Sequence, residues 1–146
     1  MQISTPGFGD GGEIPARFTC EGEDISPELR VTGIPERTVA LALIVDDPDA
    51  PSGTWDHWVE YDIPTTGPEL VIEEDAGRVG SPGLNSWNET GYGGPCPPPG
   101  APHRYFFRIY ALDQPLSVDE ADSEALRAAM ESHVLAEAEL MATFSR

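Results

Sequence analysis

Three long segments of the chain have an apolar pattern that predicts the central strands of a sheet. Residues 39–45 are apolar at every position, which indicates a strand covered on both faces. Residues 55–63 alternate between two faces, and residues 104–112 form the last strong strand. The alternation divides the side chains of 55–63 into two sets: Trp58, Glu60 and Asp62 against His57, Val59, Tyr61 and Ile63. Minor strands are predicted by shorter runs: 17–20, 28–32 and 70–73.

The last part of the chain has a different pattern. Ser117 and Glu120 have the spacing of a capping box, and residues 124–146 contain neither Gly nor Pro. Apolar residues recur there in a way that is typical of an amphipathic helix: Leu126, Met130, Val134, Leu135, Leu140, Met141 and Phe144. We therefore predict one or two C-terminal α-helices, with a break near Ser132.

Glycine and proline dominate the segments between these elements. They contribute 15 residues each to a chain of 146, a proportion that favours turns and short strands over a helical bundle. Residues 6–15 are expected to be loop, and residues 76–102 to be a long loop of the kind that usually carries function. Strands first and helices last predict a mostly β single domain over 1–146, with terminal helices packed against it.

The charge of the chain is strongly one-sided. Its eight basic residues are all arginines and its acids number 26, which gives a net charge of −18. Because the acids are spread along the chain, we expect a folded, acid-coated protein from a halophilic source. At about 1 M salt the Debye length is about 3 Å, which screens the repulsion between the carboxylates. A merely acidic mesophilic protein is the alternative. Duplex DNA and anionic membranes are poor partners for such a surface, since both depend on Lys and Arg contacts, and no nucleic-acid partner is expected.

The two cysteines and the N-terminal sequence give information about where in the cell the protein is located. Cys20 and Cys96 are too few and too far apart to predict a metal cluster or a disulfide framework, so a structural and a reactive role for Cys96 both remain open. No signal peptide is visible, and no apolar run approaches the roughly 20 residues of a membrane helix. We expect a cytoplasmic protein without stable membrane insertion.

The candidate chemistry is concentrated in two separate segments. Asp47 and Asp49 lie in a proline-rich turn directly after the strand at 39–45, and Trp55 and His57 follow within ten residues. Loops in this position commonly carry function, and an acid beside His57 would hold its tautomer. The structural alternatives are a polar turn capped by its own Asp side chains and a histidine satisfied in the core.

The second segment is the loop at 93–100 with the residues that follow it. Its glycines permit close approach of a ligand to the backbone, while its prolines stiffen it. Alternation in the next strand sends His103 and Tyr105 to one face and Arg104 to the other, where Arg104 could hold the acidic turn from behind. The alternative for 93–100 is a rigid surface loop. It lacks the Lys and Ser/Thr of a phosphate-binding P-loop, which disfavours nucleotide hydrolysis of that type.

The combined motifs resemble the phosphatidylethanolamine-binding protein family, and most closely its bacterial and archaeal Raf-kinase-inhibitor-like branch. The similarity covers nearly the whole chain, and the departure is Val31, where many relatives are expected to have Trp. The motifs that carry it are Phe18 to Pro27, Asp47-Pro48-Asp49-Ala50-Pro51, Trp55-x-His57-Trp58, and Gly94-Pro95-Cys96-Pro97-Pro98 with His103-Arg104-Tyr105.

This resemblance implies an antiparallel two-sheet β-sandwich with flanking helices and a small anion-binding pocket. Members of the family bind phosphorylated head groups, and the family has no settled catalytic activity. Carried over by motif, the ligand-binding residues would be Asp47, Trp55, His57, Cys96, Pro98, His103 and Tyr105.

Two classes of function follow for this pocket. The first is a non-enzymatic protein that binds a small phosphorylated or carboxylated ligand and has a regulatory effect on a protein partner. The second is a hydrolase with a His57–Asp47 pair as base and His103 as acid. No cofactor is expected, and a metal held by His57, His103 and Asp47 is only weakly indicated. A pure protein-interaction domain would instead have an empty pocket and a separate apolar patch, and a homodimer is also left open.

Overall fold

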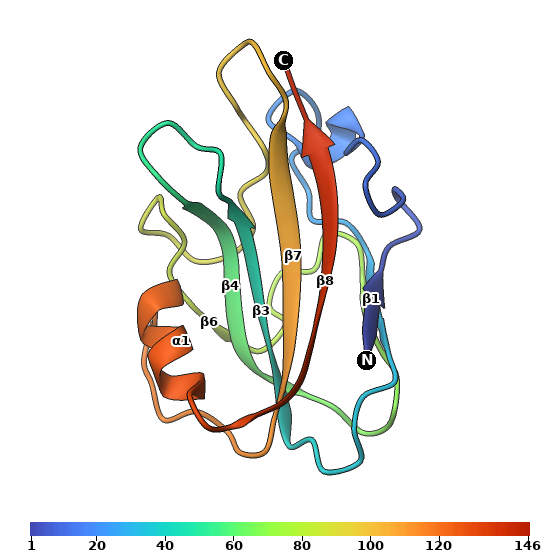
Figure 1. Cartoon of the computed structure of the whole chain (residues 1–146), viewed down its shortest axis with the longest axis vertical. Helices are drawn as coiled ribbons and strands as arrows, with labels where there is room; N and C mark the ends of the chain where they lie inside the picture. The colour runs from blue at the N-terminus through green and yellow to red at the C-terminus, as the bar shows by residue number, and fades with distance from the viewer.

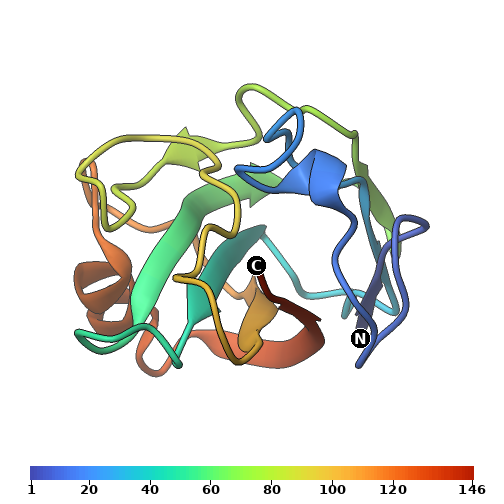
Figure 2. The same cartoon turned by 90° about the horizontal axis from the view of Figure 1, so that it is seen from above.

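The computed structural model describes residues 1–146 as two antiparallel sheets and one α-helix (Figures 1 and 2). A five-stranded sheet has the order β6-β4-β3-β7-β8, and a three-stranded sheet has the order β1-β2-β5. The elements are β1 (Gln2–Ser4), the 3-10 helix η1 (Ala16–Phe18), β2 (Leu29–Thr32), β3 (Ala40–Asp47), β4 (Trp55–Pro64), β5 (Leu70–Ile72), β6 (Ser81–Pro82), β7 (His103–Leu112), α1 (Ser123–Met130) and β8 (Val134–Phe144). The fold is therefore mostly β, as predicted.

Most of the apolar run at 39–45 lies in β3 (Ala40–Asp47), at the centre of the larger sheet, while Val39 precedes the strand and is 51% exposed. The strand pairs with β4 on one edge and β7 on the other, and all its residues are buried. Leu41 and Leu43 belong to the core cluster between the two sheets, while Ala42 and Ile44 belong to the cluster beneath α1. The continuous apolar pattern thus reflects two cores that meet at one strand.

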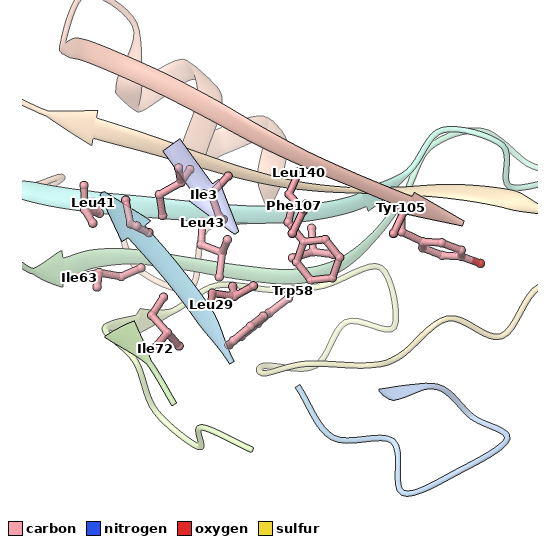
Figure 3. Packing of buried hydrophobic residues seen from close by; sticks show 14 of the residues in the cluster. Ile3, Leu29, Leu41, Leu43, Trp58, Ile63, Ile72, Tyr105, Phe107 and Leu140 are labelled. Carbon is pink, nitrogen blue, oxygen red and sulfur yellow. The ribbon is translucent and has the colours of Figure 1, made fainter. Parts of the chain in front are cut away.

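The core between the sheets is built from aliphatic and aromatic side chains of both layers (Figure 3). Leu29 of the small sheet and Trp58 and Phe107 of the large sheet are at most 1% exposed. On the other face, Leu126 and Met130 of α1 are buried in the second cluster. Burial of one such side chain contributes about 1.5–3 kcal/mol, so these contacts hold α1 and the small sheet on opposite faces of the large one.

The predicted alternation of β4 holds from Trp58 to Tyr61 and is then interrupted. Asp62 adopts φ 50°, and the pairing register with β3 shifts at this point. The Asp62 carboxylate accepts a hydrogen bond from the Leu116 backbone at 2.8 Å. Ile63 consequently joins the core cluster of Trp58, contrary to the prediction that placed it with Val59. A β-bulge of this kind turns the side chains beyond it to the opposite face.

The prediction for the C-terminal region is only partly correct. A single helix forms at 123–130, with Asp122 as N-cap in place of the predicted Ser117 box, and the Asp122 carboxylate accepts from Ala125 N at 2.9 Å. The break near Ser132 is present, with φ 69°. Residues 134–144, however, form β8 along the full length of β7. Backbone pairing and burial of alternate residues from Leu140 to Phe144 outweigh the helix propensity of the alanine-rich segment.

Two smaller sequence assignments also need comment. The predicted strand at 17–20 is wrong, because Pro15 leads into the 3-10 helix at Ala16–Phe18 and Cys20 follows in a turn. The predicted strands near 28–32 and 70–73 are confirmed as β2 and β5. The segment 76–102 is loop apart from β6. No helix in the structure has the length and apolar character needed to cross a membrane.

A buried carboxyl group makes the stability of this fold dependent on pH. Glu60 is 0% exposed, and its side chain accepts one hydrogen bond, from Trp58 Nε1 at 3.2 Å. Burial raises the pKa of Glu60 above the ordinary value of 4.5, against the opposing effect of the Trp58 hydrogen bond. The folded protein therefore binds this proton more tightly than the unfolded chain, and stability falls as pH rises from about 4.5 through the raised pKa.

We predict that Glu60→Gln removes this component of the pH dependence. The free energy of unfolding of the variant, relative to the parent, should increase as pH rises from 4.5 to 7.5, because only the parent must ionise a buried carboxyl. Urea denaturation across this pH range measures the difference. Glu36→Gln changes the same charge at an exposed position and should give a much flatter difference. Equal slopes for the two variants would contradict the assignment.

Candidate functional site

A cavity of about 390 Å³ opens at the end of the large sheet where β3 ends and β4 and β7 begin. This end of the sheet is at the top of Figure 1. All seven residues suggested by the sequence line it: Asp47, Trp55, His57, Cys96, Pro98, His103 and Tyr105. The remaining lining residues are Ala50, Pro51, Ser52, Trp87 and Pro97. The two distant segments therefore meet in one place, while the role of these residues in binding a ligand stays a prediction.

Antiparallel pairing explains why these segments meet. Asp47 is the pairing partner of Trp55 across the turn that joins β3 to β4, and Asp46 is the partner of Phe106 in β7. The last residue of β3 is thereby placed beside the first residues of both neighbours. The loop at 93–100 passes over the same end of the sheet before the chain enters β7 at His103, and its residues form one wall of the cavity.

Asp47 holds His103 rather than His57. Its Oδ2 lies 2.7 Å from His103 Nδ1, and its Oδ1 accepts a hydrogen bond from Asp49 N at 2.8 Å. Both side chains of the pair are largely buried. Since a carboxylate only accepts hydrogen bonds, Nδ1 carries the hydrogen and Nε2 is the remaining polar atom of the ring. The structure thus contradicts the predicted His57–Asp47 pair.

His57 is held by the backbone of the glycine-containing loop. Its Nδ1 donates to the Gly93 carbonyl at 2.8 Å, and Gly93 N donates to the His57 carbonyl at 2.9 Å. Burial lowers the pKa of His57, although the Gly93 carbonyl and Asp47 oppose this effect. The ring is therefore neutral at pH 7 with its hydrogen on Nδ1, and Nε2 carries a lone pair. A carbonyl, and not the acid expected from the sequence, fixes this tautomer.

Two buried donors of cavity residues have no partner within the protein. They are the Nε1 of Trp55 and the hydroxyl of Tyr105. Burial raises the pKa of the Tyr105 hydroxyl, and the negative charge of Asp47 raises it further, so the group remains a donor. In Figure 3 the Tyr105 hydroxyl points away from the packed core. An unsatisfied buried polar group costs about 1–3 kcal/mol.

The acidic turn is held from the opposite side by Arg104. The Arg104 Nε and NH2 groups each donate to the Asp49 carboxylate at 2.9 Å, and Arg104 N donates to it as well. These hydrogen bonds lower the pKa of Asp49 to about 2. The predicted contact between Arg104 and the turn is confirmed, and Arg104 is not among the residues lining the cavity.

The two cysteines form a disulfide, which corrects the sequence-based interpretation. The Cα atoms of Cys20 and Cys96 lie 5.4 Å apart although 76 positions separate them in the chain. Further contacts join the same two segments: Cys20 N donates to Pro95 O at 3.1 Å, and Gly94 N donates to the Asp24 carboxylate at 2.8 Å. Spacing along the chain gave no sign of this proximity. Cys96 therefore lines the cavity as half of a disulfide and not as a thiol.

Trp87 is a lining residue that the sequence analysis missed. Its ring packs edge-on against Trp55 at 5.4 Å and against His57 at 5.2 Å between centroids. A Cβ at Gly93 would lie 2.4 Å from the Trp87 ring, so a glycine is required there for this packing. The sequence offered one indication of this role, a large aromatic residue within a loop rich in Gly and polar residues.

The side chains of Asp47, His57 and His103 do not form a metal-binding group, and no other group of three or more His, Cys, Asp or Glu side chains in the structure could hold a metal ion.

The comparisons with known proteins identify the family. The model of the family described as phosphatidylethanolamine-binding protein matches residues 4–145, and the chain belongs to this family. A relative from Methanothermobacter thermautotrophicus, named UPF0098 protein, is 49% identical over 100% of this chain and 99% of its own length.

Solved structures agree with this assignment. A putative phosphatidylethanolamine-binding protein homolog, CT736 from Chlamydia trachomatis, has a TM-score of 0.91 and 40% identity, covering 99% of this chain and 97% of its own. Escherichia coli YbcL, described as a new member of the mammalian PEBP family, has a TM-score of 0.89 and 31% identity, covering 99% of this chain and 98% of its own.

We predict that the disulfide contributes strongly to stability. Closing a loop of this length stabilises a fold by about 4–5 kcal/mol when the effect is mainly on the unfolded chain. The Cys20→Ser/Cys96→Ser variant should lose free energy of unfolding of this order in guanidinium denaturation. A dithiol reductant should shift the parent in the same direction and leave the variant unchanged. A midpoint that does not differ between oxidised parent and variant would contradict the prediction.

Proposed function

We propose that this protein is a non-enzymatic binding protein whose cavity takes phosphate or a small phosphorylated head group. The observation that carries the proposal is the pair of unpartnered donors, Trp55 Nε1 and the Tyr105 hydroxyl, on residues that line one cavity with His57 and His103. Oxygen-rich anions offer the acceptors that such donors lack. A volume of about 390 Å³ is at the small end of ordinary ligand sites and suits a head group or a metabolite.

The hydrogen-bonding capacity of the cavity favours phosphate over an anion that carries no proton. His57 is neutral and uses its only hydrogen on Gly93, so its Nε2 accepts a hydrogen bond. A ligand that presents acceptor oxygens together with one P–OH group satisfies both Tyr105 and His57. Alternatively, the P–OH proton of the ligand moves to His57 Nε2. In both cases, binding a dianionic ligand requires the uptake of one proton.

The overall charge of −18 opposes the approach of an anion at low ionic strength. In molar salt the long-range field is screened, so the short-range donors of the cavity determine affinity. The proposed site therefore works best at high salt, which is consistent with an acid-coated surface.

A hydrolase is not proposed for this site. The base suggested by the sequence was a His57–Asp47 pair, but Asp47 pairs with His103 and His57 pairs with a backbone carbonyl. No hydroxyl is hydrogen-bonded to either histidine.

We predict saturable binding of inorganic phosphate, measured by calorimetry in 2 M salt. Tyr105→Phe removes one donor without changing the ring, and should weaken binding about 10- to 100-fold, the equivalent of a charge-assisted hydrogen bond. His57→Ala and His103→Ala should abolish measurable binding while the fold persists. Tyr61→Phe removes a hydroxyl that donates to Val118 O, remote from the cavity, and is the matched control. Parent-like affinity in both histidine variants would reject the site.

We also predict that the site discriminates by protonation. A phosphomonoester loses its second proton with a pKa of about 6, so its affinity should fall as pH rises from 6 to 8 because the complex must take up a proton. Sulfate carries no proton in this range and should bind at least tenfold more weakly than phosphate at pH 6. Competition calorimetry measures both effects. Equal affinities for the two anions would show that His57 does not accept a hydrogen bond from the ligand.

A further inference from the structure

One arginine lies against the wall of the cavity without lining it. Arg146 Nε donates to the carbonyl of Pro97 at 2.6 Å, and Pro97 is a lining residue. A second contact joins the same segments, since Gly100 N donates to the Arg146 carbonyl at 3.3 Å. Figures 1 and 2 show the end of the chain beside the gold-coloured segment that contains this loop. The residues after β8 therefore support the proline-rich wall directly.

The pairing of β7 with β8 explains this position. His103 is the partner of Phe144, so Arg146 lies two residues beyond the strand partner of a cavity histidine. The sheet ends there, and the cavity opens there. The exposed side chain of Arg146 reaches from this edge toward the loop that contains Pro97.

Five of the eight arginines have an acidic partner, whereas Arg37, Arg78 and Arg146 have none, and of these three only Arg146 donates to a residue that lines the cavity. None of the eight arginines lines the cavity, and Arg104, the neighbour of His103, is neutralised by Asp49 on the opposite face. Arg146 makes no salt bridge, and hydrogen bonding within the protein occupies only its Nε. Burial and the charge of Asp47 raise the pKa of Tyr105, and the positive charge of Arg146 acts in the opposite direction.

We propose that Arg146 is a positioning and anion-attracting residue of this site: it fixes the proline wall through Nε and presents its positive charge to an anionic ligand at the cavity mouth. This inference rests on the proposed function. A guanidinium suits both tasks, because its planar fork donates in more than one direction at once and never loses its charge. In a chain with 26 acids, one cation without an acidic partner at the mouth supplies the local attraction that the overall field opposes.

The test compares two substitutions in calorimetric titrations with inorganic phosphate at 0.2 M and 2 M salt. Arg146→Gln removes the charge and should weaken binding about three- to tenfold at 0.2 M salt, with a smaller effect at 2 M salt, where an exposed charge is screened. Arg146→Lys keeps the charge and should retain affinity within about twofold of the parent. Arg37→Gln is the matched control, because Arg37 is exposed and lies before the opposite end of β3, and it should leave affinity unchanged.

The outcomes separate this inference from the proposed function. If the parent does not bind phosphate at either salt concentration, both are rejected. If the parent binds and Arg146→Gln matches it, the role of Arg146 is rejected while the phosphate site stands. If Arg146→Lys loses as much affinity as Arg146→Gln, the residue acts on the wall alone and the charge role is overturned. Thermal unfolding of each variant confirms that the compared proteins are folded.

Discussion

The pairing of β3 on both of its edges is the constraint from which the rest of the structure follows. This strand is hydrogen-bonded to β4 and β7, and its apolar side chains supply one face to each of the two cores. Its direction determines which ends of its neighbours lie side by side. Because both neighbours are antiparallel to it, the end of one strand and the beginnings of two others converge. Asp46 and Asp47 follow the apolar residues of β3 and therefore lie at this end of the sheet.

The central strands could be predicted from the sequence because burial against the two cores alone determines their patterns of apolar residues. Residues 40–45 are apolar because two layers cover them, and residues 58–61 alternate because the two faces of β4 meet different cores. The pattern failed where another force was stronger. Val134 to Phe144 contains good helix formers, yet β7 offers a complete set of backbone partners, and pairing prevails. The bulge at Asp62 was invisible because a left-handed aspartate leaves no periodic signal.

The residues of the candidate site were easier to predict than their contacts. Motif similarity selected seven residues, and all of them line one cavity. Sequence could not indicate which histidine Asp47 binds, because His57 and His103 both lie near the beginning of a strand that neighbours β3, at the same end of the sheet. Nor could it indicate the disulfide, since proximity in space arises only when the loop at 93–100 packs against the N-terminal segment. Trp87 was missed for the same reason: its contacts with Trp55 and His57 depend on the path of a long loop.

The bond between Cys20 and Cys96 ties the N-terminal segment to the wall of the candidate site, even though no residue before Asp47 lines the cavity. A substitution or deletion near residue 20 therefore affects the wall of the cavity through this bond. Removing the first twenty residues would take away Cys20 and so release one side of the proline-rich wall. Among homologues, the two cysteine positions should accordingly be gained or lost as a pair, and the shape of the cavity mouth should change with them.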